Sequence, residues 1–479
     1  MSSWLFQVYN SLPPWARSTA ASVRGAYLRS WRYGHDSDRL VEEAHERERW
    51  SEEQWHAWRE ERLAYVLHRA ATRVPYYREQ WTRRRAHGDR SSWEALENWP
   101  VLEKEALRER PEAFVADDCD RGRMFHLQTS GTTGKPIHLW RSRETVRALY
   151  ALSAARARGW HGARRGDRYA MLGGQMVVPL AQRKPPFWVW NASLGQLYMS
   201  TFHLAPDLIP FYLEALVRYR ISHFYGYTSS LHALALEVLR LGRRDLRMTV
   251  AITNAEPLSE EQRRVISEAF QCRVCETYGM GELTAAASEC EAGHLHQWPE
   301  VGWVERLEGV APAPPGESGD LVGTGLLNAD MPLIRYRIGD RGHPVEPGPP
   351  CACGRGLPLF GRIEGRNSDL LITRDGRKVF WLNPVFYGLP LRQSQIIQES
   401  LDRIRVRYVP ADGFDDASAR TLVERLQARV GEVAVSLEEM ADIPRGPNGK
   451  FQPVICLLSP EERTHARPEA VGGQPTVSH

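Results

Sequence analysis

The spacing of apolar residues predicts a helical N-terminal region followed by an α/β chain. From Ser51 to His87, apolar side chains recur three and four residues apart, and Pro75 interrupts the run, which predicts two consecutive helices. From Phe125 onward, β-like runs alternate with helical ones, as in RYAMLGG, SHFYGY, SSLHALALEVLRLG, LRMTVAIT and SEEQRRVISEAFQ. That alternation predicts an α/β fold with parallel strands flanked by helices.

Changes of pattern farther along the chain predict its division into parts. The turn-rich stretch EGVAPAPPGESGD leads into the β-like runs LVGTGLLN and PLIRYRIGDRG, and a small mixed α+β pattern begins after this region. The expected parts are a basic, aromatic segment with helices (1–50), a large N-terminal α/β domain (51–365), a small α+β C-terminal domain (366–458) and a polar, disordered tail (459–479).

Composition excludes several classes of protein. Hydrophobic residues at 42% and charged residues at 25% are typical of a globular protein. No run approaches the roughly 18 apolar residues of a membrane-spanning helix, and we see no secretory signal. The net charge of +3 is small and dispersed, which gives no case for nucleic-acid binding. Seven cysteines, an odd number, favour a reduced, cytoplasmic protein.

The first 35 residues are basic and aromatic. No acidic residue precedes Asp36, and a segment of this kind can lie on the surface of an anionic membrane. The commoner alternative is a helix that packs on the domain and leaves its arginines in water. The residues concerned are Trp4, Phe6, Trp15, Arg17, Arg24, Tyr27, Arg29, Trp31, Arg32 and Tyr33.

The motif QTSGTTGKP, from Gln128 to Pro136, is typical of a phosphate-binding loop. Its glycines let the backbone approach an anion, its hydroxyl groups can donate hydrogen bonds, and Lys135 adds a point charge. The motif is not a Walker A sequence, because only two residues separate its glycines and Pro136 follows the lysine. Lysine is scarce in this chain, since only five of the 62 basic residues are lysines, and Lys135 is one of the five.

The same motif resembles the phosphate-loop signature of the adenylate-forming superfamily, which includes acyl-CoA synthetases, nonribosomal adenylation domains and luciferases. Further similarities follow in order: GYTSSLHALA (226–235), TNAEPLS (253–259), YGMGE (278–282), PLIRYRIGDRG (332–342), GRNSDLL (365–371) and GPNGKF (446–451). Within the superfamily, VPYYREQW, GLLNADMPLIRYR and CACGRGLPL look like the phenylacetate–coenzyme A ligase and CapK-like branch.

The resemblance implies a ligase that activates a carboxylic acid with ATP and Mg²⁺. A carboxylate attacks the α-phosphate, pyrophosphate leaves, and the acyl-adenylate then passes its acyl group to a nucleophile while the small domain moves. Coenzyme A is the expected acceptor; an amide or ester made directly on an amine or a sugar-linked group is the alternative. A non-catalytic, membrane-associated scaffold is a weaker alternative.

The resemblance also implies roles for particular residues, with Lys450 and Glu282 as the catalytic pair. Lys450 would bridge the substrate carboxylate and the α-phosphate, and Glu282 would bind magnesium. Asp340 would accept hydrogen bonds from the ribose hydroxyls, and Arg366 would contact the ribose–phosphate region. The other expected ATP- or AMP-binding residues are Thr129, Ser130, Gly131, Thr132, Thr133, Gly134, Lys135, Ala255, Glu256, Tyr278 and Gly279.

Two positions depart from the pattern of the relatives. Gly281 stands where they usually carry threonine or serine, so a hydroxyl that would bond the adenylate is missing. Ser368 stands where relatives often carry a charged residue. Either change would tune rate or substrate choice without removing the core chemistry.

Cys290, His296, Cys351 and Cys353 form a second candidate constellation. Three thiolates and one imidazole would complete a tetrahedral, structural zinc site. The spacing of these residues is by itself weak evidence for a zinc site, and the resemblance strengthens it because the branch carries matching residues. The LHxxPE pattern of that branch favours His296 over His294 as the ligand. Cys272 and Cys275 form a CxxC pair that we interpret as buried strand residues, not as a redox centre.

The chemical identity of the acid stays open in the sequence. The segment from Trp160 to Phe202 is rich in aromatic residues, which would suit an aromatic or apolar acid but equally suits packing. The oligomeric state is also open, a dimer included.

Overall fold

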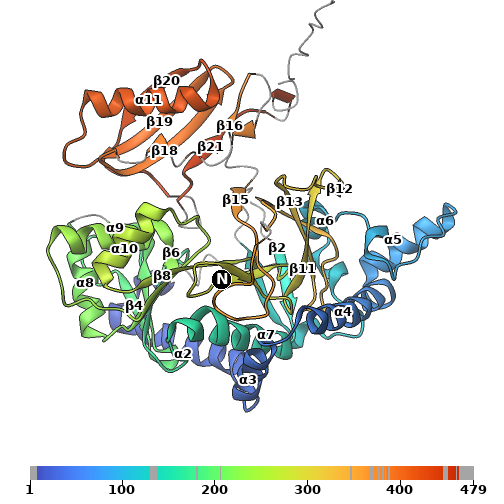
Figure 1. The fold of residues 1–479 in the computed structure, drawn as a ribbon. Coiled ribbons are helices and arrows are strands. Elements are labelled where there is room, and N and C mark those ends of the chain that lie inside the picture. The colour runs from blue at the N-terminus through green and yellow to red at the C-terminus, as the bar shows by residue number, and fades with distance from the viewer. Residues whose placement is uncertain are drawn as a thin grey trace, which may run out of the picture. The chain divides into compact units, whose positions relative to one another are not determined.

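The computed structural model divides the chain into two units, each described by itself (Figure 1). Unit 1 comprises Met1–Ile363 and Asn448–Lys450, and unit 2 comprises Glu364–Pro447 and Phe451–His479. The described residues are 8–129, 137–179, 182–204, 207–345, 348–366, 371–374, 378–379, 382, 385–386, 389–445, 451–459 and 461–462.

Unit 1 begins with a series of helices whose boundaries follow from their sequence. Ser51 forms a capping box with Gln54 at the start of α4, and Pro75 occupies the first turn of α5, where its missing N–H costs no hydrogen bond. The two helices expected on either side of Pro75 are thereby confirmed. The helices are α2 (Pro14–Arg32), α3 (Ser37–Arg47), α4 (Glu52–Arg73), α5 (Pro75–Ala86) and α6 (Lys104–Glu109).

An eight-stranded sheet forms the α/β part of unit 1. Its order is β10-β9-β8-β7-β6-β3-β5-β4, with β5, β3, β6, β7 and β8 parallel and antiparallel strands at both edges. The strands are β3 (Tyr169–Gly173), β4 (Trp188–Asn191), β5 (Gln196–Ser200), β6 (His223–Tyr227), β7 (Val250–Asn254), β8 (Arg273–Gly279), β9 (Ala286–Glu289) and β10 (Leu295–Gln297).

Helices cover the sheet, as the alternating pattern predicts. Buried side chains of α8 (Ile209–Arg218), α9 (Thr228–Arg240) and α10 (Glu260–Phe270) pack against the strands in one apolar cluster that includes Leu213, Leu234 and Ile266. Helix α7 (Arg143–Leu152) contacts α2 and α3, and α2 also packs on β4. Parallel strands fed by helical crossovers bury both of their faces, which explains the near-continuous apolar runs in the sequence.

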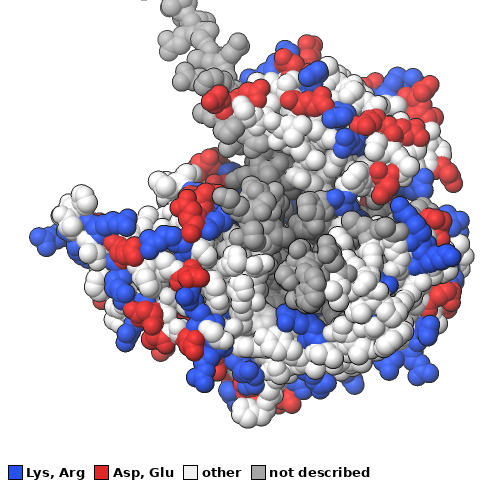
Figure 2. Space-filling model, turned by 180° about the vertical axis from the view of Figure 1, so that it is seen from behind, with Lys and Arg blue, Asp and Glu red and all other residues white. Residues whose placement is uncertain are grey.

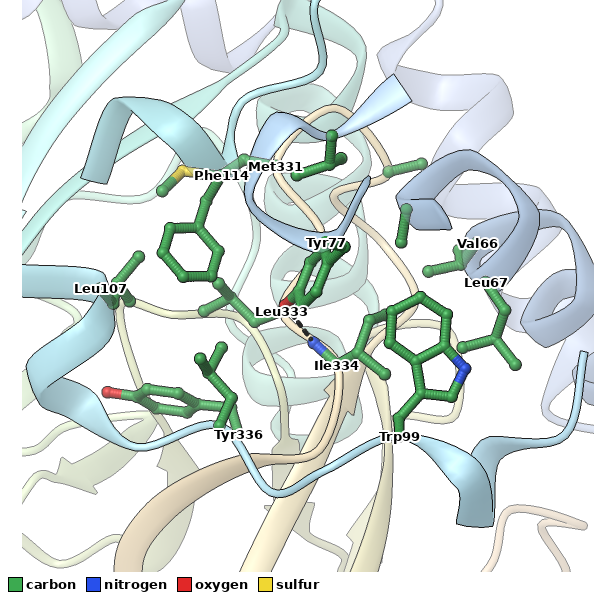
Figure 3. Packing of buried hydrophobic residues seen from close by; sticks show 14 of the residues in the cluster. Val66, Leu67, Tyr77, Trp99, Leu107, Phe114, Met331, Leu333, Ile334 and Tyr336 are labelled. Atoms are coloured by element: carbon green, nitrogen blue, oxygen red, sulfur yellow. Dashed lines mark hydrogen bonds between the residues drawn. The ribbon is translucent and has the colours of Figure 1, made fainter. Parts of the chain in front are cut away.

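A second, antiparallel sheet of five strands packs with the N-terminal helices. Its order is β12-β11-β13-β14-β15, and the hairpin of β1 (Phe125–Thr129) and β2 (Ile137–Arg141) lies beside it. The main core cluster joins them, and Figure 3 shows Tyr77, Trp99, Phe114 and Tyr336 within it. The strands are β11 (Gly302–Glu308), β12 (Ala311–Pro312), β13 (Gly319–Gly325), β14 (Tyr336–Gly342) and β15 (Ile363–Arg366).

Unit 2 is a small α+β fold. A four-stranded sheet of order β20-β19-β18-β21 packs on α11 (Asp416–Val430), whose Leu422 and Leu426 are fully buried. Its strands are β18 (Leu391–Ser400), β19 (Arg403–Pro410), β20 (Ala434–Glu439) and β21 (Val454–Cys456), with a separate pair, β16 (Leu371–Ile372) and β17 (Lys378–Val379).

On the face seen in Figure 2, Lys and Arg side chains are mixed with Asp and Glu side chains, mainly around the edge of the face. Within the described part of the chain, every helix is too short or too polar to cross a bilayer.

Candidate functional site

The carboxyl end of β8 and the middle of β14 meet through a direct hydrogen bond. The Tyr278 hydroxyl donates to Asp340 Oδ2 at 2.7 Å, although 62 residues separate the two in sequence. The Tyr278 ring also packs against Phe360, with ring centroids 5.4 Å apart. Two of the residues expected around the nucleoside are therefore neighbours, and one oxygen of Asp340 is already oriented by Tyr278.

The turn after β8 places Glu282 beside a fully buried tyrosine. The hydroxyl of Tyr336, the first residue of β14, donates to Glu282 Oε1 at 2.9 Å. Burial raises the pKa of Tyr336 above its usual range, and the neighbouring charge of Glu282 raises it further, so the phenol keeps its proton. Glu282 itself is half-buried.

A buried arginine completes the electrostatic surroundings of this turn. Arg141, at the end of β2, is 8% exposed and donates to the carbonyl oxygen of Gly281. Burial lowers the pKa of Arg141 to about 10, against the opposing effects of Tyr150 and Glu282. The guanidinium therefore stays charged near neutral pH and balances the carboxylate of Glu282.

Gly281 lies against the last residue of the β1 strand. A methyl group built on Gly281 would lie 2.8 Å from Thr129 Cγ2, closer than side chains tolerate, with Leu127 and Leu139 at 3.7 Å. The larger residue that relatives carry here would therefore collide with Thr129. The absence of a side chain at position 281 thus has a packing reason.

The segment expected around the adenine, Ala255 and Glu256, follows β7 in an unusual conformation. Ala255 has φ 61°, in the left-handed region that non-glycine residues rarely adopt, which is a mark of a constrained site. The Glu256 carboxylate accepts a hydrogen bond from the Ser229 backbone N–H at 2.8 Å, at the first turn of α9. The side chain of Glu256 thus caps a helix.

Several expected site residues lie outside the described residues. They are Ser130, Gly131, Thr132, Thr133, Gly134 and Lys135 of the phosphate loop, Ser368, and Lys450; for Arg366, only the backbone is described. The expected tail falls almost entirely in this category. The structure does describe the two strands on either side of this loop, β1 and β2, which pair with each other up to Thr129 and Ile137.

Cys290, His296, Cys351 and Cys353 come together, with one donor atom of each within 4.8 Å of the others. Cys290 Sγ lies 3.7 Å from Cys351 Sγ, and Cys353 Sγ lies 3.4 Å from His296 Nε2. A tetrahedron with zinc–sulfur bonds of about 2.3 Å and zinc–nitrogen bonds of about 2.0 Å has edges of roughly 3.8 and 3.5 Å. The donor set therefore fits zinc in both chemistry and spacing.

The orientation of His296 also suits a metal ligand. Its Nδ1–H donates to the Leu357 carbonyl at 3.0 Å, which directs Nε2 toward the thiols. His294 is exposed, and its Nδ1 lies 3.5 Å from Cys351 Sγ, outside the group of four.

The loop of Cys351 and Cys353 is attached to the N-terminal helices. Arg355 stacks on the Trp160 ring at 4.3 Å and pairs with Glu48 at the end of α3, and Gly356 N–H donates to the Glu48 carbonyl at 2.8 Å. A side chain on Gly356 would collide with the Trp50 carbonyl at 1.9 Å. The cluster thus joins β9 and β10, at the edge of the large sheet, to the N-terminal helices. A link of this kind would stabilise the fold.

The CxxC pair and several aromatic residues between Trp160 and Phe202 are packed within unit 1. Cys272 and Cys275 are buried, and burial raises the pKa of the Cys272 thiol to about 12, which leaves it unreactive. In the segment from Trp160 to Phe202, Phe187 is fully buried and stacks on His203 and Tyr212. Trp190 packs on Tyr219. These contacts favour the packing alternative for the aromatic residues concerned.

Sequence reasoning missed two residues of this site, Tyr336 and Arg141. Tyr336 is part of the motif PLIRYRIGDRG, but the motif suggests a role only for Asp340, because a carboxylate has obvious binding chemistry. Arg141 is one of many arginines, and only the pairing of β1 with β2 shows that it ends a hairpin beside Gly281.

Comparisons with known proteins agree with this architecture. Residues 56–329, more than half of the chain, match the family of AMP-binding enzymes, and residues 371–456 match the CapK C-terminal domain. Protein CapK of Staphylococcus aureus is 26% identical over 384 residues, covering 78% of this chain and 83% of that protein. A phenylacetate–coenzyme A ligase of Thermus thermophilus is 27% identical over 453 residues, covering 85% of this chain and 97% of that enzyme.

A solved structure, 2-hydroxyisobutyryl-CoA ligase in the postadenylation state, shares the fold. Its TM-score is 0.65 at 23% identity, covering 86% of this chain and 91% of that one. The expected fold class, a large α/β domain followed by a small α+β domain, is confirmed.

The fold and the gathered motifs define an adenylate-forming ligase, an AMP-forming enzyme. The chain belongs to the family of AMP-binding enzymes, and its similarity extends to CapK and the phenylacetate–coenzyme A ligases.

The contact between Gly281 and Thr129 leads to a prediction. Gly281→Ala is expected to lower the free energy of unfolding by about 1–3 kcal/mol, because the added methyl group overpacks the turn. The same change in a Thr129→Ser background, which lacks Cγ2, is expected to cost less than about 0.5 kcal/mol. Chemical denaturation of the four proteins measures the coupling, and an equal cost in both backgrounds would contradict the packing explanation.

Proposed function

We propose that this enzyme activates a small carboxylic acid as an acyl-adenylate and transfers the acyl group to coenzyme A. The observation that carries the proposal is the gathering, within unit 1, of Tyr278, Glu282 and Asp340 beside the hairpin of the phosphate loop. The named relatives, phenylacetate–coenzyme A ligases and 2-hydroxyisobutyryl-CoA ligase, support coenzyme A as the acceptor.

The proposed roles follow from the chemistry of each group. The loop of Ser130 to Lys135 binds the β- and γ-phosphates; Thr129 lies beside it, and Glu282 contributes one carboxylate to Mg²⁺, a cation that prefers oxygen ligands. Asp340 accepts from the ribose, and Tyr278 flanks the adenine. Arg366 contacts the ribose–phosphate region. Catalysis then consists of charge neutralisation and positioning, to which Lys450 adds a cation between the carboxylate and the α-phosphate.

A second acceptor class is supported by the similarity to CapK. For a chain that is similar to CapK as well as to the coenzyme A ligases, an amide or ester formed on an amine or sugar-linked group is the alternative second step. Membership in a family of enzymes argues against the scaffold alternative.

The test is a panel of carboxylic acids, assayed for pyrophosphate release and for hydroxamate trapping of the acyl-adenylate. The wild-type enzyme is expected to release pyrophosphate with at least one acid and to form a thioester when coenzyme A is present. Lys450→Ala is expected to lower adenylation by about 10²-fold or more, because a cation aimed at developing charge is lost. ATP binding should persist in this variant.

Lys184→Ala, which removes an exposed lysine of another loop, is the matched control and should retain full activity. Pyrophosphate release without thioester formation would favour the amine or sugar-linked acceptor. Near-normal adenylation by Lys450→Ala would contradict the role of that lysine.

We also propose that Cys290, His296, Cys351 and Cys353 hold a structural zinc ion. Support comes from the distances among the four donors and from the Leu357 carbonyl that orients His296. Four protein ligands leave no open position, so the ion would stabilise the fold and take no part in the reaction.

Protein purified without chelator is expected to contain about one zinc ion per chain by mass spectrometry. Cys353→Ser is expected to lose the ion and to unfold at a lower temperature, because metal binding contributes to folding. Cys456→Ser, a change at a buried cysteine of unit 2 outside the group, should keep the zinc. A zinc content near zero in the wild-type protein would contradict the proposal.

We further propose that α2 brings the enzyme to an anionic membrane surface. Trp15 is 73% exposed, Val23 68% and Tyr27 46%, and these apolar side chains lie along one outward stripe of the helix. Arg24 stacks on Tyr27 at 5.0 Å, and no acidic residue lies between residue 8 and Asp36. Apolar side chains bordered by arginines are the pattern of a helix that lies in the headgroup region.

Val23→Glu is expected to abolish co-sedimentation with phosphatidylglycerol vesicles, because the added carboxylate is repelled by the surface and cannot enter it. Val310→Glu is the matched control, since Val310 is an equally exposed valine, at 75%, in the β11–β12 turn. Neutral phosphatidylcholine vesicles should bind the wild-type protein weakly. Equal binding by both variants would contradict the role of α2.

A further inference from the structure

The carboxylate proposed to bind magnesium is held by a residue that belongs to the hydrophobic core. Tyr336 has no exposed surface, and its neighbours in the main core cluster include Leu107 and Leu333. Its hydroxyl reaches out of that cluster and donates to Glu282 Oε1 at 2.9 Å. In Figure 3 the hydroxyl of Tyr336 points away from Tyr77, whose own hydroxyl is bound within the core.

The backbone of Tyr336 is fixed on both sides. It pairs with Gly323 of β13, and it forms a bridge with Leu102 on its other side. Two backbone hydrogen bonds flank it, with Leu102 N–H donating to the Arg335 carbonyl at 2.8 Å and Arg337 N–H donating to the Leu102 carbonyl at 3.0 Å. A buried ring on a backbone held from both sides has little freedom, so its hydroxyl is a fixed point in the site.

Two cations lie close to this pair. The Lys104 ammonium lies 5.9 Å from the centre of the Tyr336 ring, within reach of a cation–π contact. On the other side, Arg141 binds the Gly281 carbonyl, which fixes the backbone one residue before Glu282. Glu282 is thus held through its side chain by Tyr336 and through the preceding carbonyl by Arg141.

We infer that Tyr336 is a positioning residue for the metal: it occupies one oxygen of Glu282 and turns the other oxygen toward Mg²⁺ bound with ATP. This role rests on the proposed function, in which Glu282 is the magnesium ligand. A carboxylate that already accepts one hydrogen bond offers a single oxygen, which suits the octahedral geometry of Mg²⁺ better than a bidentate contact. Partners of a metal ligand typically change metal affinity by 10- to 100-fold.

The test compares ATP binding with and without Mg²⁺ by calorimetry, with no carboxylic acid present. The ratio of the two affinities measures the coupling between metal and nucleotide. Tyr336→Phe is expected to lower this ratio about tenfold while the metal-free affinity for ATP stays as in the wild-type enzyme. In a Glu282→Gln background, Tyr336→Phe is expected to have no further effect, because the carboxylate that it orients is gone.

Tyr77→Phe is the matched control. Tyr77 is a buried tyrosine of the same core cluster, and its hydroxyl donates to the Pro332 carbonyl at 3.3 Å and accepts from Ile334 N–H at 3.0 Å. Its removal should lower the unfolding temperature but leave the coupling unchanged, which separates positioning from general loss of stability.

The possible failures are distinguishable. An unchanged ratio in Tyr336→Phe, or a fall in metal-free ATP affinity with the ratio unchanged, would overturn the positioning role alone. A wild-type protein that binds ATP equally well with and without Mg²⁺ would overturn the assignment of Glu282, and the role of Tyr336 with it.

Discussion

The site depends on one close crossing of backbones, at Leu283 and Thr284. Three glycines of the antiparallel sheet lie against this segment: a Cβ on Gly302 would lie 2.1 Å from the Thr284 carbonyl oxygen, one on Gly323 would lie 2.7 Å from Thr284 Cβ, and one on Gly325 would lie 3.1 Å from the Leu283 oxygen. Leu283 adopts φ 55°, a conformation that costs free energy and persists only where the surroundings enforce it. The β8–β9 connection of the large sheet can approach β11 and β13 of the antiparallel sheet this closely only because those glycines have no side chains.

This crossing explains why Glu282 has a defined place although it lies in a turn. On one side the backbone is fixed by Thr284, which is fully buried, and on the other by the fit of Gly281 against Thr129. The side chain is then oriented from the core through Tyr336. The carboxylate proposed to bind magnesium thus obtains the rigidity of both sheets, which is what preorganised catalysis requires and what an ordinary loop cannot supply.

The sequence predicted the α/β pattern and the identity of the site motifs because both are local. Hydrophobic periodicity showed α4, α5, α9 and α10. The sequence could not show the pairing of Tyr278 with Asp340 or of Glu282 with Tyr336, since those bonds join residues 62 and 54 positions apart. Nor could it show that Glu256 caps α9, because only the fold places the turn after β7 at the first turn of that helix. The roles of Lys135 and Lys450 still rest on the motifs alone.

Gly281 shows how a departure from a family motif can be understood once its neighbour is known. In sequence, the glycine is only a missing hydroxyl, which would tune rate or substrate choice. In the structure, the turn after β8 packs against the end of β1. The methyl group of Thr129 therefore fills the space that a side chain at position 281 would need. Thr129 is itself a hydroxyl-bearing residue at the entrance to the phosphate loop. The two positions therefore form one unit of packing. A motif read one residue at a time cannot reveal this contact, because the two residues lie 152 positions apart in the sequence and meet only in the folded protein.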